Sequence, residues 1–265
     1  MNSFSKSLRL MGNNFTITVV SEDRITADCH IDIAIAEIQR IEKLFTTFDP
    51  NSQTNLINEY AGIKPVVVDE EVFKLIERSI TISNLTQGAF DITYGSIDKG
   101  LWNFDTNMTA LPSHEIAKKM VYLINYRNII LNKEQLSVML LNKGMRIGFG
   151  GIGKGYAAEM AKKKLVERNV LSGIINASGD LTTWGTQASG KPWTIGIAHP
   201  DHPSSAFSCL NISGKAIATS GNYEKCIIIN GKKFSHTIDP KTGFPVTGIK
   251  SVTVISNNAE LADAM

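Results

Sequence analysis

Residues 148–155 read GFGGIGKG, and this stretch decides between two kinds of phosphate-binding fold. As G-x-G-x-x-G, with glycines at Gly148, Gly150 and Gly153, it matches the dinucleotide fingerprint of a parallel βαβ unit. As G-x-x-x-x-G-K it matches the front of a P-loop. A P-loop needs Ser or Thr directly after the lysine to ligate Mg²⁺, and Gly155 stands there instead. The P-loop interpretation therefore fails.

The dinucleotide interpretation is weak as well. An acidic residue that holds the ribose is expected about 20 residues beyond the last glycine, whereas Asp180 lies 27 residues beyond Gly153. The short segments before the loop are typical of a β-meander rather than of a parallel unit. Two simpler interpretations stay open: a tight turn whose glycines permit close packing, and an anion site at the N-terminus of the helix that follows.

Hydrophobic spacing on either side of the loop predicts helices early in the chain and antiparallel strands late. Helices are predicted by three- and four-residue steps of apolar side chains over 30–45, 71–88 and 156–168. Strands are predicted over 14–20, 128–131, 136–141, 145–149, 173–178, 193–198 and 250–256. Asn230-Gly231 predicts a tight hairpin within 225–239. Together these elements predict an α+β fold with mixed, largely antiparallel sheets flanked by helices.

Composition excludes several classes of protein. Apolar residues make up 43% and charged residues 20% of the 265, as in ordinary globular domains. The 27 basic and 25 acidic side chains are spread along the chain, so no nucleic-acid footprint is expected. Cys29, Cys209 and Cys226 form no C-x-x-C pair, so neither a zinc cage nor a disulfide framework is expected. Without a long apolar run or a visible leader, a soluble cytoplasmic protein is expected.

Two polar segments are candidates for a site. TQGAFDITYGSI (86–97) places Asp91 and Thr93 after a predicted helix end, where Asp91 either lines a ligand loop or caps the next turn. FSHTIDPKTGFPV (234–246) carries His236 three residues before an aspartate. A Ser-His-Asp hydrolase is a formal possibility there, but the upstream ATSGN segment lacks the G-x-S-x-G elbow, which disfavours it.

Eight segments in order along nearly the whole chain resemble the FAD:protein FMN transferase family, the ApbE-like flavin transferases. They are LMGNNFTI, FDPNSQTNLIN, TQGAFDITYGSIDKGLWNF, GFGGIGKGYAAE, IINASGDLTTWG, ATSGNYEK, FSHTIDPKTGFPV and SVTVISNNAELADAM. The resemblance implies one ApbE-like domain over 1–265. It also implies an enzyme that cleaves FAD with Mg²⁺, attaches FMN through a phosphoester bond to a Thr of an acceptor protein, and releases AMP.

The resemblance further implies a set of site residues. FAD contacts fall on Met11, Gln53, Thr54, Asn55, Ala89, Phe90, Asp91, Gly150, Tyr156 and Ile238. The metal takes the backbone carbonyl of Gly153 and the carboxylate of Asp263, and His236 is the candidate base for the acceptor hydroxyl. An apolar, partly aromatic wall for the flavin ring suits Phe90 and Tyr156.

The chain departs from the family pattern in four places. Gly148 and Glu159 stand where the family commonly has Asp, and Ser178-Gly179-Asp180 replaces a frequent G-G-D. The family pattern continues past ADAM to a Thr that completes the metal site, whereas this chain stops at Met265. The resemblance therefore implies either a chain lacking its C-terminal end or an impaired metal site. Family members often work outside the cytoplasm behind a lipid anchor or signal.

Three other functions stay open. The first is a Mg²⁺-dependent FAD pyrophosphatase, in which water replaces the Thr acceptor and the products are FMN and AMP. The second is a non-catalytic FAD-binding protein. The third, a NAD-dependent dehydrogenase, rests on the glycine fingerprint alone and is the most remote.

Overall fold

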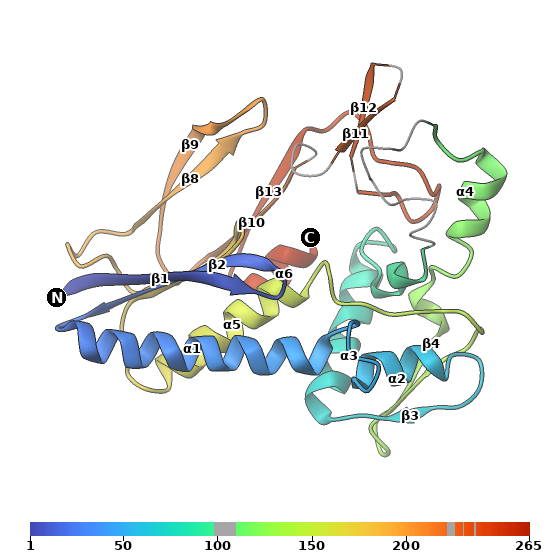
Figure 1. Ribbon diagram of the computed structural model, residues 1–265, viewed down its shortest axis with the longest axis horizontal. Coiled ribbons are helices and arrows are strands. Elements are labelled where there is room, and N and C mark those ends of the chain that lie inside the picture. Colours follow the sequence, from blue (N-terminus) through green and yellow to red (C-terminus); the bar gives the residue numbers. More distant parts are fainter. Residues whose placement is uncertain (98–109, 222–225, 230, 236) are drawn as a thin grey trace. The chain divides into compact units, whose positions relative to one another are not determined.

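The computed structural model describes residues 1–97, 110–221, 226–229, 231–235 and 237–265. The chain divides into two compact units, each assembled from separated segments (Figure 1). Unit 1 comprises Met1–Lys43, Gly150–Ser220 and Val252–Met265, and unit 2 comprises Leu44–Phe149 and Gly221–Ser251. The single domain expected over 1–265 stays a prediction.

A six-stranded sheet forms the framework of unit 1, in the order β1-β2-β6-β7-β10-β13. Its strands are β1 (Asn2–Leu10), β2 (Asn13–Ser21), β6 (Gly173–Ala177), β7 (Asp180–Trp184), β10 (Ala216–Gly221) and β13 (Ser251–Ser256). The predicted alternation over 14–20 is confirmed, because Phe15, Ile17 and Val19 are fully buried on β2. β6 runs antiparallel to both β2 and β7. No parallel βαβ crossover therefore surrounds the glycine loop, and the dinucleotide interpretation is wrong.

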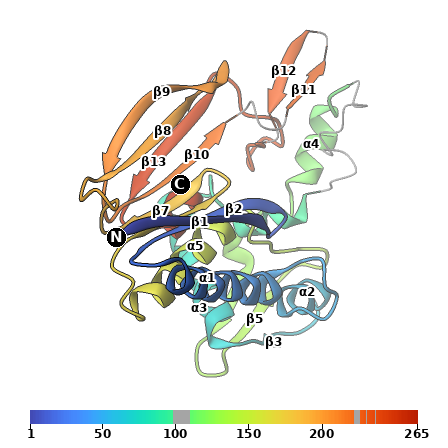
Figure 2. The ribbon, with the colours of Figure 1, turned by 60° about the vertical axis from the view of Figure 1, so that its left-hand side comes forward.

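Three helices of unit 1 matter for the site: α1 (Arg24–Phe45), α5 (Gly153–Val166) and α6 (Ala259–Ala264). α1 and α5 lie on the same side of the sheet (Figure 2). The predicted apolar face of α1 is confirmed by Ile31, Ile38 and Ile41, which are fully buried. α1 begins before residue 30 because the Asp23 carboxylate accepts from the backbone N–H and the hydroxyl of Thr26, at 2.9 and 2.8 Å. A separate hairpin joins β8 (Trp193–His199) to β9 (His202–Ile212).

Unit 2 combines helices with a small sheet and a hairpin. Its helices are α2 (Gln53–Glu59), α3 (Glu70–Leu85) and α4 (His114–Met120), with 3₁₀ turns η1 (Ile92–Ser96) and η2 (Tyr126–Asn128). Its sheet has the order β3-β5-β4, with β3 (Val66–Val67), β5 (Ser137–Leu140) and β4 (Ile129–Asn132). Phe45 and Phe149 pack edge to face in this unit, with ring centroids 4.8 Å apart.

The predicted hairpin in 225–239 is confirmed by β11 (Cys226–Ile229) and β12 (Lys232–Ser235), which pair antiparallel with Ile229 opposite Lys232. That register leaves a two-residue loop. Gly231 has the expected positive φ of 75°. Asn230 lies outside the described residues.

The strand predicted over 145–149 is wrong. The backbone of Ile147 is paired by one side chain: its N–H donates to Asn58 Oδ1 at 2.7 Å, and its carbonyl accepts from Asn58 Nδ2 at 3.1 Å. The next N–H, of Gly148, donates to the Ile92 carbonyl at 3.0 Å. The Asn58 side-chain amide and the Ile92 backbone carbonyl thus make the hydrogen bonds that a neighbouring strand would otherwise make.

The expected α+β class is confirmed by these helices and antiparallel pairings. In the described ranges no helix has both the length and the hydropathy to cross a bilayer.

Candidate functional site

The glycine loop leads directly into α5, and its glycines are not needed for unusual backbone angles. Gly150, Gly153 and Gly155 all lie outside the left-handed region. A Cβ on Gly150 would meet no atom within 4 Å. One on Gly155 would overlap the Ala259 carbonyl oxygen and lie 2.8 Å from the Asp263 Cβ. Close packing therefore explains the glycine at 155, because α6 crosses α5 there.

Three charged side chains of unit 1 meet at the first turn of α5. The backbone N–H of Gly155 donates to Asp263 Oδ2 at 2.9 Å. The Lys154 ammonium donates to Asp263 Oδ1 at 3.3 Å and also to Asp180 Oδ2 at the start of β7. The two carboxylates are nearly buried, with side-chain exposures of 9% for Asp180 and 6% for Asp263. A carboxylate is favoured at this position because unpaired N–H groups give a helix N-terminus a partial positive charge.

This cluster holds more negative than positive charge, since two carboxylates face one ammonium. Burial and the neighbouring Asp263 raise the pKa of Asp180, Lys154 opposes them, and the pKa that results is about 6. Burial lowers the pKa of Lys154, but Asp263 and Asp180 outweigh burial, so the pKa lies above its usual value. Lys154 is therefore held as a cation between the two acids.

These residues fit a Mg²⁺ ion, the metal that the family resemblance implies. Carboxylates and backbone carbonyls are the hard oxygen donors that Mg²⁺ prefers. A dication would also offset the excess negative charge of Asp180 and Asp263. Within the described residues no three His, Cys, Asp or Glu side chains are grouped for a metal. Mg²⁺ is usually held by one or two carboxylates, with water and phosphate completing its shell. Gly153 and Asp263 stay predicted ligands.

Three of the predicted FAD contacts fall in unit 1. Met11 stands with Gly12 in the two-residue turn between β1 and β2, with φ of 50° and 73°. Its carbonyl accepts from Asn13 Nδ2 at 2.8 Å. Gly150 precedes α5, and Tyr156, on the first turn of that helix, is 4% exposed.

Gln53, Thr54 and Asn55 fall at the start of α2 in unit 2, where each side chain has an internal partner. The Gln53 amide donates to the Asp69 carboxylate at 2.6 Å and accepts from the Asp69 N–H at 2.7 Å. Thr54 is fully buried and its hydroxyl donates to the Phe45 carbonyl at 3.3 Å. Asn55 Nδ2 donates to the carbonyls of residues 47 and 49, at 2.9 and 2.7 Å. These side chains shape the loop before α2.

Asp91 is a buried cap in unit 2, which is the second of the two roles that the sequence left open. Asp91 Oδ1 accepts from the N–H and the hydroxyl of Thr93 at 2.8 and 2.6 Å, and Oδ2 accepts from the Tyr126 N–H at 2.8 Å. Burial raises its pKa, and the hydrogen bonds from Thr93 and Tyr126 act against that shift. Beside it, Ala89 is exposed and Phe90 is half-buried.

Ile238 also lies in unit 2, where it is buried and packs in a cluster with Ile97 and Tyr94. Burial raises the pKa of Tyr94 to about 12, and a hydrogen bond with the Ile238 backbone acts against that shift. The predicted base, His236, lies outside the described residues. Its neighbour Asp239 accepts from the Lys241 N–H at 2.8 Å within a turn.

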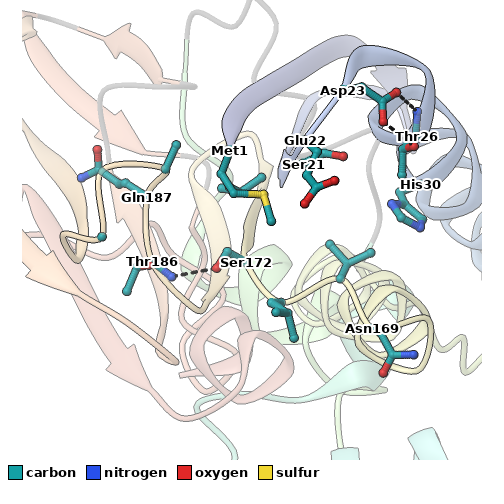
Figure 3. A pocket seen from close by; sticks show the side chains of 15 residues that line it. Met1, Ser21, Glu22, Asp23, Thr26, His30, Asn169, Ser172, Thr186 and Gln187 are labelled. Carbon is teal, nitrogen blue, oxygen red and sulfur yellow. Dashed lines mark hydrogen bonds between the residues drawn. The ribbon is translucent and has the colours of Figure 1, made fainter.

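A pocket of about 430 Å³ in unit 1 (Figure 3) is lined by none of the predicted site residues. Its lining comes from the end of β2, the start of α1 and the loops 169–172 and 186–190. Several of its polar groups already have partners, since Asp23 caps α1 and the Ser172 hydroxyl accepts from the Thr186 N–H at 3.1 Å. The charged cluster at α5 is therefore the stronger candidate.

The sequence missed that Lys154, Asp180 and Asp263 form one cluster. Lys154 was a P-loop candidate and Asp180 a ribose candidate, but neither pattern joins them to a residue 109 positions beyond Lys154. The available signal was position: Lys154 stands in the first turn of α5, and Asp180 is the first residue of β7.

Comparisons with known proteins identify the family of the chain. The model of the ApbE family matches residues 11–265. The chain is 32% identical over 258 residues to the FAD:protein FMN transferase of Klebsiella pneumoniae (strain 342), covering 97% of this chain and 78% of that protein. It is 26% identical over 283 residues to the protein of the same name from Treponema pallidum (strain Nichols), covering 100% of this chain and 77% of that protein.

Solved structures give the same result. The ApbE protein of Thermotoga maritima superposes with a TM-score of 0.90 at 30% identity, over 99% of this chain and 84% of that one. The apo flavinyl transferase ApbE of Pseudomonas stutzeri superposes with a TM-score of 0.84, over 100% and 83% of the two chains. At 23% identity that second likeness concerns the fold alone. The family model and the 32% identical relative show that the chain belongs to the ApbE family and is an enzyme, a transferase.

Proposed function

We propose that this chain transfers FMN from FAD to a Thr hydroxyl of an acceptor protein, with Mg²⁺, and releases AMP. Family membership and the relatives named FAD:protein FMN transferase support flavin transfer. The observation that carries the proposal is the buried Lys154–Asp180–Asp263 cluster at the first turn of α5. Pyrophosphate cleavage depends on charge neutralisation and positioning, and this cluster offers a cation, two oxygen-donor acids and a helix N-terminus.

In the proposed reaction, the acceptor hydroxyl oxygen forms a bond to the phosphorus on the flavin side of the FAD pyrophosphate. The bond from that phosphorus to the bridging oxygen breaks, and AMP leaves with the bond's electron pair. The hydroxyl proton passes to a base, for which His236 is the candidate. Lys154 stabilises negative charge near the first turn of α5. Mg²⁺, when bound, supplies charge neutralisation at the pyrophosphate, and Gly153 and Asp263 would hold it.

For FAD binding we propose the ten positions Met11, Gln53, Thr54, Asn55, Ala89, Phe90, Asp91, Gly150, Tyr156 and Ile238. The internal partners of Gln53, Asn55 and Asp91 constrain how these residues act. Their side chains would shape the binding loops, and the exposed backbone and apolar groups beside them would contact FAD. Phe90, whose side chain is half-buried, is the candidate for an aromatic wall against the flavin ring.

The test measures AMP release from FAD with Mg²⁺, with and without a peptide that carries an acceptor Thr. Wild-type protein is compared with His236→Ala, with Asp263→Asn and with the control Asp32→Asn, whose carboxylate forms an exposed ion pair with Lys6. AMP together with flavinylated peptide is expected. His236→Ala should bind FAD without transfer, Asp263→Asn should need more Mg²⁺, and the control should match the wild type.

Each other outcome identifies a different function. AMP with free FMN, and no labelled peptide, would indicate the pyrophosphatase. Tight FAD binding without AMP at any Mg²⁺ concentration would indicate a flavin-binding protein. Binding of NAD without binding of flavin would overturn the proposal.

A further inference from the structure

Glu159, on α5, makes three hydrogen bonds that the proposed chemistry does not use. Its Oε2 accepts from the backbone N–H of Ala259 at 3.0 Å and from the Thr182 hydroxyl at 3.2 Å. Its Oε1 accepts from the Lys162 ammonium at 2.9 Å. All four residues belong to unit 1, and the side chains of Glu159 and Lys162 are each only 16% exposed. A carboxylate with this many partners is fixed in place.

The Ala259 N–H is the first of α6, a helix of six residues that ends at Ala264. The first N–H groups of a helix have no partner inside the helix. Helices this short are marginal on their own in water. Asn258 Oδ1 accepts the Leu261 N–H at 2.8 Å, and Glu159 accepts the Ala259 N–H. Two N–H groups of the first turn of α6 are thus paired by side chains, one of which comes from α5.

The two helices meet at two matched pairs of positions. Gly155 contacts Asp263, and Glu159 contacts Ala259. The two α5 residues are four apart, as are the two α6 residues, so each pair lies one turn from the other on facing surfaces. The helices therefore cross antiparallel at these two points. Fixing Ala259 against Glu159 places the next turn of α6, and with it the Asp263 carboxylate, at the N-terminus of α5.

We propose that Glu159 is a positioning residue, which anchors α6 so that the Asp263 carboxylate stands ready for the metal. The inference rests on the proposed function in one respect, the role of Asp263 as a Mg²⁺ ligand. Glu159 acts through α6, because its carboxylate accepts the Ala259 N–H and is fixed in place by Thr182 and Lys162. The family commonly has Asp at position 159. The longer Glu159 side chain of this chain lets one carboxylate reach α6, β7 and Lys162 together.

The test compares Glu159→Met, Glu159→Gln and Lys162→Met with the wild type. Met fills a similar volume but accepts no hydrogen bond, whereas Gln keeps one acceptor oxygen for the Ala259 N–H. Lys162→Met removes the ion pair and leaves the anchor. Hydrogen exchange of the amides of 259–265 and Mg²⁺ affinity by titration calorimetry are measured for each.

In Glu159→Met the amides of α6 should exchange at least about 10-fold faster than in the wild type. Its Mg²⁺ affinity should fall by about 10- to 100-fold, the range for removing a group that orients a metal ligand. Glu159→Gln and Lys162→Met should keep both properties within about threefold of the wild type, a change smaller than the about 10-fold lower limit of that range. If Glu159→Met does not fold, the double variant Glu159→Met/Lys162→Met, which leaves no unpaired charge, is compared with Lys162→Met.

Unchanged exchange of α6 in the Met variants would overturn the anchor. Faster exchange with unchanged Mg²⁺ affinity would reduce Glu159 to a purely structural role and overturn its positioning of the metal ligand. A wild-type protein that binds no Mg²⁺ would instead contradict the proposed function. In that case hydrogen exchange still decides whether Glu159 fixes α6.

Discussion

Met11 has a left-handed backbone, with φ of 50°, which costs a residue with a Cβ about 1–2 kcal/mol. The two-residue turn between β1 and β2 needs positive φ at both positions, and Gly12 meets that need without strain. Methionine is an unusual choice here. Strained positions often mark function, which agrees with Met11 as a predicted FAD contact.

Replacing Met11 with Asn, which tolerates the left-handed region, should raise the free energy of unfolding by about 0.5–1 kcal/mol. It should weaken FAD binding at the same time. Urea unfolding and flavin fluorescence measure the two effects. Leu136→Asn is the matched control, since Leu136 has φ of 47° in the β4–β5 turn and is not a predicted contact. Unchanged FAD affinity in Met11→Asn would remove Met11 from the FAD site.

Asp91 should make the stability of the protein depend on pH, and the surroundings of its carboxyl group set the sign of that dependence. The pKa of Asp91 in the folded protein lies above the ordinary value of an aspartate side chain, because burial outweighs the hydrogen bonds from Thr93 and Tyr126. The folded protein therefore keeps the proton to higher pH than the unfolded chain. The stability that Asp91 contributes is full below about 3.8 and is lost as pH rises through the folded pKa.

The advantage of the wild type over Asp91→Asn should accordingly shrink as pH rises from about 4, the unfolded pKa. The free energy of unfolding of both proteins, measured by urea at several pH values from 4 to about 7, gives the difference. A difference that grows with pH would mean that the three hydrogen bonds to the carboxylate outweigh its burial.

At the scale of elements, the contact between α5 and α6 depends on a missing side chain. A Cβ on Gly155 would overlap the Ala259 carbonyl oxygen, and both neighbours on α6 are backbone or Cβ atoms that cannot rotate away. Gly155→Ala should therefore lower the free energy of unfolding by about 1–3 kcal/mol, despite the better helix propensity of Ala. Gly150→Ala, whose Cβ meets open space, is the stability control. Equal stability of the two variants would show that α6 shifts freely.

Elements with strong periodicity could be predicted from the sequence, and those held by partners distant in the chain could not. The buried isoleucines predicted α1, and alternation predicted β2. In β1, Phe4, Leu8 and Leu10 alternate with polar residues, but Lys6 interrupts the apolar face and most side chains are exposed. β1 was therefore missed, and its pairing with β2 defines it. Residues 145–149 alternate like a strand, but Asn58 pairs their backbone instead.

The same division applies to the candidate site. The resemblance implies Gly153 and Asp263 as metal ligands, because both lie in matching motifs, and this stays a prediction. It did not identify the Lys154–Asp180 ion pair or the Glu159–Ala259 contact. Those contacts depend on where α6 packs on α5, and residues about 100 positions apart in sequence meet only in the folded protein.

At the scale of the whole molecule, the chain passes between the two units four times, so unit 1 is closed by segments from both ends of the sequence. The charged cluster exists only once the third segment, Val252–Met265, has docked on α5. Closing so long a loop costs conformational entropy, which the contacts of α6 must offset. The stability of unit 1 and the geometry of the candidate metal site are therefore linked.

Lys154 tests this link. Lys154→Met leaves Asp180 and Asp263 buried together without a cation, and breaking a buried ion pair from one side costs roughly 3 kcal/mol. In EDTA the variant should lose about that much unfolding free energy, whereas Lys6→Met, which removes an exposed pair with Asp32, should lose less than about 1 kcal/mol. Mg²⁺ should restore much of the loss in Lys154→Met, because an ion that binds only the folded state stabilises it by mass action. The amides whose hydrogen exchange is slowed by Mg²⁺ should be those of α6 and the first turn of α5. A gain from Mg²⁺ that is equal in Lys154→Met and the wild type would show that the ion binds elsewhere than beside these two carboxylates.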